Sequence, residues 1–150
     1  MHGGDLSLSR LHEPNYGQFV QRQTPELVTV GGMFERCGNL GSINLDGWNA
    51  PKVTSCWFML YGTAAEAIDL SGVTFGKIDS AQSLFSDNYS LKSVKFGAGI
   101  DFSSTTKMHT MFYYCGKLQL DCSEWNVRAD AEHSDFNEGA PGVILPEVWQ

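Results

Sequence analysis

A two-residue apolar motif recurs along this chain at a nearly constant interval. Its copies are Met33-Phe34, Met59-Leu60, Leu84-Phe85, Met111-Phe112 and, with one apolar residue replaced, Asp135-Phe136, so that successive copies lie about 26 residues apart. A fixed period of this length is typical of repeat proteins, in which each unit buries its apolar face against its neighbours. The chain is therefore expected to be a stack of about four or five coils.

Each unit carries two kinds of pattern. An apolar residue at every second position after the motif predicts a short strand, and apolar residues three apart before it predict a short helical or 3₁₀ segment. Stacked units would form a parallel sheet of short strands on one face, helical or 3₁₀ segments on the other, and a ladder of aromatic rings inside. The expected fold class is an α/β repeat solenoid, with an all-β solenoid as the alternative. The strand triplets are Ile43-Asn44-Leu45, Ile68-Asp69-Leu70, Val94-Lys95-Phe96 and Leu120-Asp121-Cys122.

The units in the region 26–150 resemble the BspA-like leucine-rich repeat, a repeat of roughly 26 residues found in bacterial surface proteins and lipoproteins. The shared features are the Met-Phe pair, a Cys or small residue four positions after the Met, a Leu, the strand triplet, and an aromatic such as Trp48 or Trp125. Residues 61–67 and 96–106 depart from this pattern. The resemblance implies a leucine-rich-repeat-like fold and a binding or adhesion role at the cell surface or outside the cell.

The chain is long enough for one domain with a continuous core. Repeat arrays need atypical end units that cover the open apolar faces, and residues 1–32 are expected to form the N-terminal cap. Residues 33–150 would hold about four units, closed by a C-terminal cap at 140–150. In that cap, Pro141 and Pro146 block further strand pairing and Trp149 lies over the last coil.

Charge and hydropathy exclude two classes of partner. The chain has 17 acidic and 10 basic residues and a net charge of -7, which gives no footprint for a nucleic-acid backbone. No stretch approaches the roughly 20 apolar residues of a membrane helix, so no membrane insertion is expected. An N-terminal signal peptide is not recognisable in this chain either. An extracellular or cell-surface location therefore rests on the family resemblance.

Catalytic and metal chemistry find little support in the sequence. Cys37 and Cys115 fall at the same position three coils apart, roughly 14 Å at about 4.8 Å per coil, which is too far for a disulfide. Buried thiols are expected, with a bridge between Cys37 and Cys56 left open. No metal-binding spacing and no cofactor motif is present, and the four histidines have no predictable catalytic partner. They are His2, His12, His109 and His133. The chain is predicted not to be an enzyme.

The outward side chains of the strands form the first candidate binding face. The middle residues of the triplets would align as one polar row, with flanking polar rows beside it. A solvated surface held by weak ion pairs is the other interpretation of this face. The candidate residues are Asn44, Asp46, Asp69, Ser71, Lys95, Gln119, Asp121 and Ser123.

Aromatic residues outside the repeat pattern form the second candidate. Tyr and Trp are frequent at binding surfaces because they combine a large contact area with a polar group, although packing in the core or a cap would also explain them. These residues are Trp57, Tyr61, Tyr113 and Tyr114.

Two functions are consistent with these patterns. The first is a non-catalytic binding or adhesion module that recognises a protein or glycan ligand through the sheet face. The alternative is a structural spacer or decoration domain in a larger assembly, such as a cell wall or a phage particle. The sequence predicts neither the ligand nor the oligomeric state.

Overall fold

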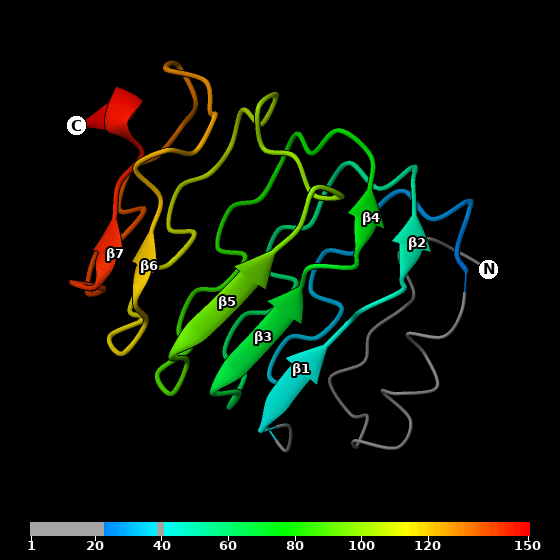
Figure 1. The fold of residues 1–150 in the computed structure, drawn as a ribbon, viewed down its shortest axis with the longest axis horizontal. Helices are drawn as coiled ribbons and strands as arrows, with labels where there is room; N and C mark the ends of the chain where they lie inside the picture. The colour runs from blue at the N-terminus through cyan, green and yellow to red at the C-terminus, as the bar shows by residue number, and fades with distance from the viewer. Residues whose placement is uncertain (1–22, 39–40) are drawn as a thin grey trace.

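The computed structural model describes residues 23–38 and 41–150, and these residues are mostly strands and loops with almost no helix (Figure 1). The single short helix among them is the 3₁₀ turn η1, and every strand pairing among them is parallel. The elements are β1 (Ser42–Asn44), β2 (Asn49–Ala50), β3 (Ala67–Leu70), β4 (Thr74–Phe75), β5 (Ser93–Phe96), β6 (Leu120–Asp121), β7 (Val143–Ile144) and η1 (Glu147–Trp149).

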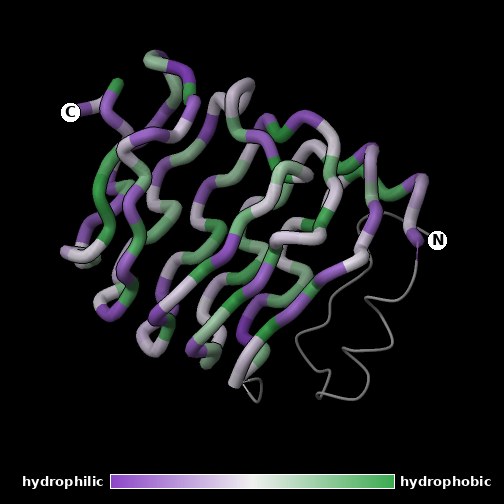
Figure 2. The backbone as a smooth tube through the Cα atoms, viewed as in Figure 1, coloured by the Kyte–Doolittle hydropathy of each residue, from purple (hydrophilic) through white to green (hydrophobic). Residues whose placement is uncertain are grey.

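The strands stack from one repeat to the next. In the largest sheet, ordered β1-β3-β5, Ile43 lies opposite Ile68 and Ile68 lies opposite Val94. β2 pairs with β4, and β6 pairs with β7. The predicted strand positions and the predicted parallel pairing are therefore confirmed for the first three units. Inward and outward residues alternate along β1, β3 and β5, which Figure 2 shows as alternating hydrophobic and hydrophilic bands.

The segments predicted to be helical or 3₁₀ are chains of turns instead of regular helices. The N–H of Met33 donates to the carbonyl of Val30 three residues back, at 3.1 Å, as in a 3₁₀ turn. The next N–H, that of Phe34, leaves the segment and donates to the carbonyl of Met59 in the following coil, at 2.8 Å. This alternation continues through the unit and repeats in the later ones. Because the turns share the three-residue spacing of a helix, the apolar pattern did not distinguish the two.

Two positions of each unit have left-handed backbone, and in every unit but the last the N–H of each of these residues donates to a carbonyl of the next coil. The φ values of these residues lie between 53° and 71°, although most of them are not glycine. A left-handed conformation costs an L-residue roughly 1–2 kcal/mol, so the hydrogen bonds between coils must offset it. The first column is Gly32, Phe58, Ser83, Thr110 and Asp135, and the second is Arg36, Gly62, Asp87, Tyr114 and Gly139.

These columns correct the register of the last unit. Thr110 and Asp135 occupy the same left-handed position, so the last interval is one residue longer than the motif alignment implies. Phe136 therefore corresponds to Met111, and its carbonyl accepts from the N–H of Phe112 at 2.9 Å. The sequence alignment matched Asp135 to Met111 because it paired the two phenylalanines.

The interior is filled by the recurring motif and by a column of small residues. Phe34, Phe85 and Phe112 are fully buried, and the rings of Phe85 and Phe112 stack at 5.2 Å. The small-residue column continues through the second unit, at Thr63, although residues 61–67 depart from the repeat pattern. Its members, all buried, are Cys37, Thr63, Asn88, Cys115 and Ala140.

The two expected caps differ in how much of each the structure describes. Most of the expected N-terminal cap, residues 1–22, lies outside the described residues. Of the remainder, Leu27 and Val30 are buried as part of a regular coil, and the Val30 N–H donates to the Ser55 carbonyl at 3.0 Å. At the other end, the Trp149 ring stacks on His133 at 4.3 Å and covers the last coil.

Removal of the ring of Phe112 tests the internal ladder. Phe112→Ala is expected to lower the free energy of unfolding by about 3–5 kcal/mol, the range for a buried aromatic. The control, Tyr89→Ala, removes an exposed ring and is expected to change stability by less than about 0.5 kcal/mol. Urea denaturation measures both variants. Equal effects would show that the assignment of inside and outside is wrong.

A close approach between the backbones of two coils supplies a second test. A Cβ on Gly97 would lie 2.0 Å from the Ser71 carbonyl oxygen, whereas one on Gly116 would meet nothing nearer than 3.6 Å. Gly97→Ala must displace backbone and is expected to destabilise by more than about 2 kcal/mol, with Gly116→Ala within about 0.5 kcal/mol of the parent. Thermal denaturation compares the pair. A neutral Gly97→Ala would mean that the coils are not packed this closely.

Candidate binding surfaces

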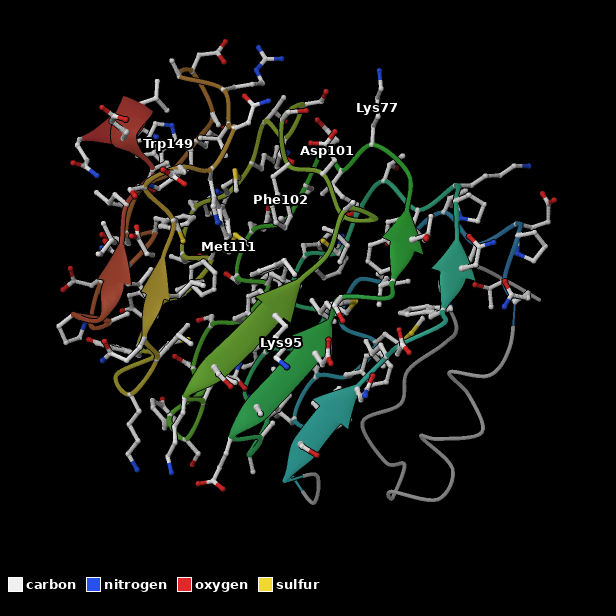
Figure 3. All side chains as sticks on the ribbon, viewed as in Figure 1. Lys77, Lys95, Asp101, Phe102, Met111 and Trp149 are labelled. Carbon is white, nitrogen blue, oxygen red and sulfur yellow. The ribbon has the colours of Figure 1, made fainter. Side chains whose placement is uncertain are left out.

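The sheet face brings three of the predicted polar residues together. Asn44, Asp69 and Lys95 lie side by side on β1, β3 and β5, because the parallel register places each opposite the next. Lys95 is labelled on β5 in Figure 3. A hollow of about 190 Å³ lies along this row. Its polar and small lining residues are Ser42, Asn44, Ala67, Asp69, Ser93 and Lys95.

The acidic and amide side chains of this face also end the strands. Asp69 Oδ1 accepts from the Ser71 N–H at 2.9 Å and from its hydroxyl at 2.6 Å, and Asp121 Oδ1 accepts from the Ser123 N–H at 2.9 Å. Asn44 Oδ1 accepts from the Asp46 N–H in the same way, at 2.8 Å. These side chains are therefore held in defined positions while facing solvent.

The same hydrogen bonds stabilise the ionised carboxylates. Bonds from Ser71 lower the pKa of Asp69, with a smaller contribution from the nearby charge of Lys95, and bonds from Ser123 lower the pKa of Asp121. Asp101 forms the same turn with Ser103, which lowers its pKa as well. Asp69 and Lys95 thus present opposite charges on neighbouring strands.

The expected four-residue row is interrupted after Lys95. Asp121 lies on β6 and is paired with Ile144 of β7, so it belongs to a different ladder. The extra residues after β5 separate the two ladders, although the Gln119 N–H still reaches the Lys92 carbonyl at 3.3 Å. The outer predicted residues pack along the edges of the face. The Gln119 amide lies against Gly142, and the Asp46 carboxylate lies against Gly72.

The predicted aromatic residues lie along the turns on the other side of each coil. Trp57 and Tyr114 are 41% and 44% exposed, and each ring lies against a glycine of a neighbouring coil, Gly31 and Gly139 respectively. Tyr61 and Tyr113 are only partly exposed. A large part of the aromatic signal in the sequence is therefore explained by packing between coils.

A groove on the turn side joins Tyr61 to residues that the sequence analysis did not single out. The Tyr61 hydroxyl donates to Asp87 Oδ2 at 2.7 Å, which raises the pKa of Tyr61, and the Arg36 guanidinium lies 5.9 Å from the ring centroid. The exposed ring of Tyr89 completes the groove, whose volume is about 490 Å³. Arg36, Tyr61 and Asp87 lie about one repeat apart in the sequence, and this spacing is the sequence feature that could have predicted the cluster.

A family model described as "Mycoplasma protein of unknown function, DUF285" matches residues 32–143. The chain belongs to this family. No curated protein and no solved structure matches it. The matched region begins at Gly32 and ends in β7, so DUF285 includes every residue of both left-handed columns.

All four cysteines of this DUF285 chain lie within the described residues, are buried and form no disulfide. Burial raises the pKa of Cys37 to about 11 and those of Cys56, Cys115 and Cys122 to about 12. At neutral pH these groups are thiols and poor nucleophiles.

Among the residues that the structure describes, histidines and carboxylates do not gather in one cluster. His109 lies 3.4 Å from Glu132, whereas His133 stacks on Trp149; His2 and His12 lie outside the described residues. Within residues 23–38 and 41–150, no group of three His, Cys, Asp or Glu side chains could hold a metal ion. In the same part of the chain, no helix is long and apolar enough to cross a membrane.

Acid should weaken the strand ends. The pKa values of Asp69, Asp101 and Asp121 are lower in the folded chain, so their stabilising contribution is complete above the unfolded value near 3.9 and is lost as the pH falls through the folded values. The free energy of unfolding, measured in urea, should fall between about pH 5 and about pH 2. The double variant Asp69→Asn/Asp121→Asn should fall less steeply. Parallel curves would contradict this assignment.

Proposed function

We propose that the chain is a non-catalytic binding module that recognises a protein or glycan ligand through the sheet face. The observation that carries the proposal is the row Asn44, Asp69 and Lys95 on three neighbouring strands. Its side chains offer hydrogen-bond donors, hydrogen-bond acceptors and charges of both signs. They are held at the fixed spacing of a parallel ladder, about 4.8 Å. Hydrogen bonds hold the Asp69 carboxylate before any ligand arrives, which lowers the ordering cost of binding.

The fold that we propose for this role is a repeat solenoid similar to the BspA-like leucine-rich repeat. Three features support it: a recurring interval of about 26 residues, parallel strands on one side and hydrogen-bonded turns on the other. Because turns replace the expected helical segments, the all-β alternative fits better than the α/β form. Stacks of this kind present extended surfaces that suit macromolecular ligands.

We also propose that the module acts outside the cell or at its surface. This location follows from the resemblance to repeats of bacterial surface proteins. A polar face of modest size is suited to adhesion, in which many copies of one weak interaction act together.

A structural spacer or decoration domain is the second candidate. Ile144 and Val148 favour it, because these apolar side chains are 48% and 51% exposed at the C-terminal end of the stack. Contact with another chain of a larger assembly would cover them.

A binding screen against immobilised glycans and matrix proteins tests the first function. For any ligand found, the double variant Asp69→Asn/Lys95→Gln is expected to weaken binding at least about tenfold, because it removes both charges of the row. The amide that replaces the Asp69 carboxylate still accepts the Ser71 hydrogen bonds, so the strand end is preserved.

The matched control for that screen is Lys77→Gln/Asp79→Asn. It removes one exposed charge of each sign from outside the sheet face. Binding that survives the sheet-face variant, or that falls equally in the control, would overturn the proposed site.

A further inference from the structure

An open groove of about 340 Å³ lies where the strand ladder is interrupted between β5 and β6. Its volume is in the range of small-molecule sites, and it is lined mainly by apolar and aromatic residues with two polar ones. The groove is separate from the sheet-face row. An inference about the groove therefore does not depend on the function proposed for that row. The lining residues are Phe96, Ala98, Ile100, Asp101, Phe102, Trp125, Asn126 and Val127.

The groove results from the long third unit. This unit, from Ser83 to Thr110, is the longest between left-handed residues of the first column, and its extra length falls after β5. There the chain is pressed against the preceding coil, since a Cβ on Gly97 or Gly99 would lie within 2.0 Å of a backbone carbonyl oxygen of that coil. The following coil does not pair with this segment as β5 pairs with β3, so a space remains on that side.

Three rings form one wall of the groove. The Trp125 ring lies 5.3 Å from Phe96 in an edge-to-face arrangement and 5.4 Å from Phe102 in a stacked one. Phe102 and the neighbouring lining residue Ile100 are buried, whereas Phe96 and Trp125 are partly exposed. Aromatic faces carry negative electrostatic potential, which attracts cations.

Asp101 adds a formal negative charge at the rim. Asp101 is exposed, and its Oδ1 atom accepts from the Ser103 N–H at 2.9 Å, which fixes the carboxylate beside Phe102. In Figure 3, Asp101 lies at the outer edge and the Lys77 side chain projects outward from the same edge. The positive charge of Lys77 favours the ionised state of Asp101.

We propose that this groove binds a small, soluble quaternary ammonium compound of the choline type. Methyl groups of such a cation would displace water from the aromatic wall, while its charge would interact with the ring faces and with Asp101. The overall charge of -7 also favours a cation. A ligand carrying a phosphate next to the ammonium group would bring a negative charge towards Asp101, so the phospholipid headgroup is disfavoured.

The test titrates the full chain with choline chloride and follows the indole N–H signal of Trp125 by nuclear magnetic resonance, assigned with Trp125→Phe. Sodium chloride at equal ionic strength corrects for salt. Choline is expected to shift this signal with millimolar affinity. Dimethylbutanol, the neutral carbon isostere of choline, is expected to bind at least about fivefold more weakly, because it has the same shape without the charge.

A pair of carboxylate variants isolates the charge of the rim. Asp101→Asn keeps the acceptor for the Ser103 N–H and should weaken choline binding about three- to tenfold. Asp121→Asn, which alters the same kind of turn outside the groove, should leave it unchanged.

Three results would overturn the proposal. The first is equal affinity for dimethylbutanol and choline, and the second is an equal loss in the Asp121→Asn control. The third is a Trp125 signal that choline does not shift, whether the chain co-sediments with phosphatidylcholine vesicles or shows no binding at all.

Discussion

Hydrogen bonds that leave alternate residues of each turn segment and reach the next coil hold this structure together. The bond from Phe34 N–H to Met59, repeated from Phe85 to Met111, fixes the spacing between coils and their register. The internal stack of phenylalanines, the parallel pairing of β1, β3 and β5, and the polar row on the sheet face all depend on that register. In every unit but the last, the left-handed residues donate their N–H groups into this network, which offsets the cost of their backbone conformation.

The sequence predicted the features that depend on burial. The strand triplets, the buried Met-Phe motif and the parallel stacking follow from apolar periodicity, which is strong in every unit. The turn segments were predicted to be helical or 3₁₀ because helices and such turns both place apolar residues three apart. The destination of the alternate N–H groups and the left-handed backbone separate the two structures, and apolar periodicity encodes neither. Asp135 was misaligned for a related reason, since its left-handed backbone has no apolar signature.

The candidate sites were predictable only in part. Asn44, Asp69 and Lys95 meet because their strands are regular, but Asp121 was assigned to the same row without allowance for the longer third unit. Arg36, Asp87 and Tyr89 meet in a groove on the turn side, and their contacts depend on side-chain reach rather than on periodicity. The groove beside Trp125 exists because the ladder is interrupted, so a regular repeat pattern could not reveal it.

The two left-handed columns also restrict where such a chain can change length during evolution. Within every unit they are separated by the same short step, as from Thr110 to Tyr114, whereas the stretch between units is longer from Asp87 to Thr110 than from Gly62 to Ser83. One inserted residue inside the short step would exchange the N–H groups that bond to the next coil with those that bond within the turn. The following coil would then be detached. Insertions and deletions are therefore tolerated only in the connections that carry the strands. New pockets, such as the one after β5, arise in those connections while the turns stay constant.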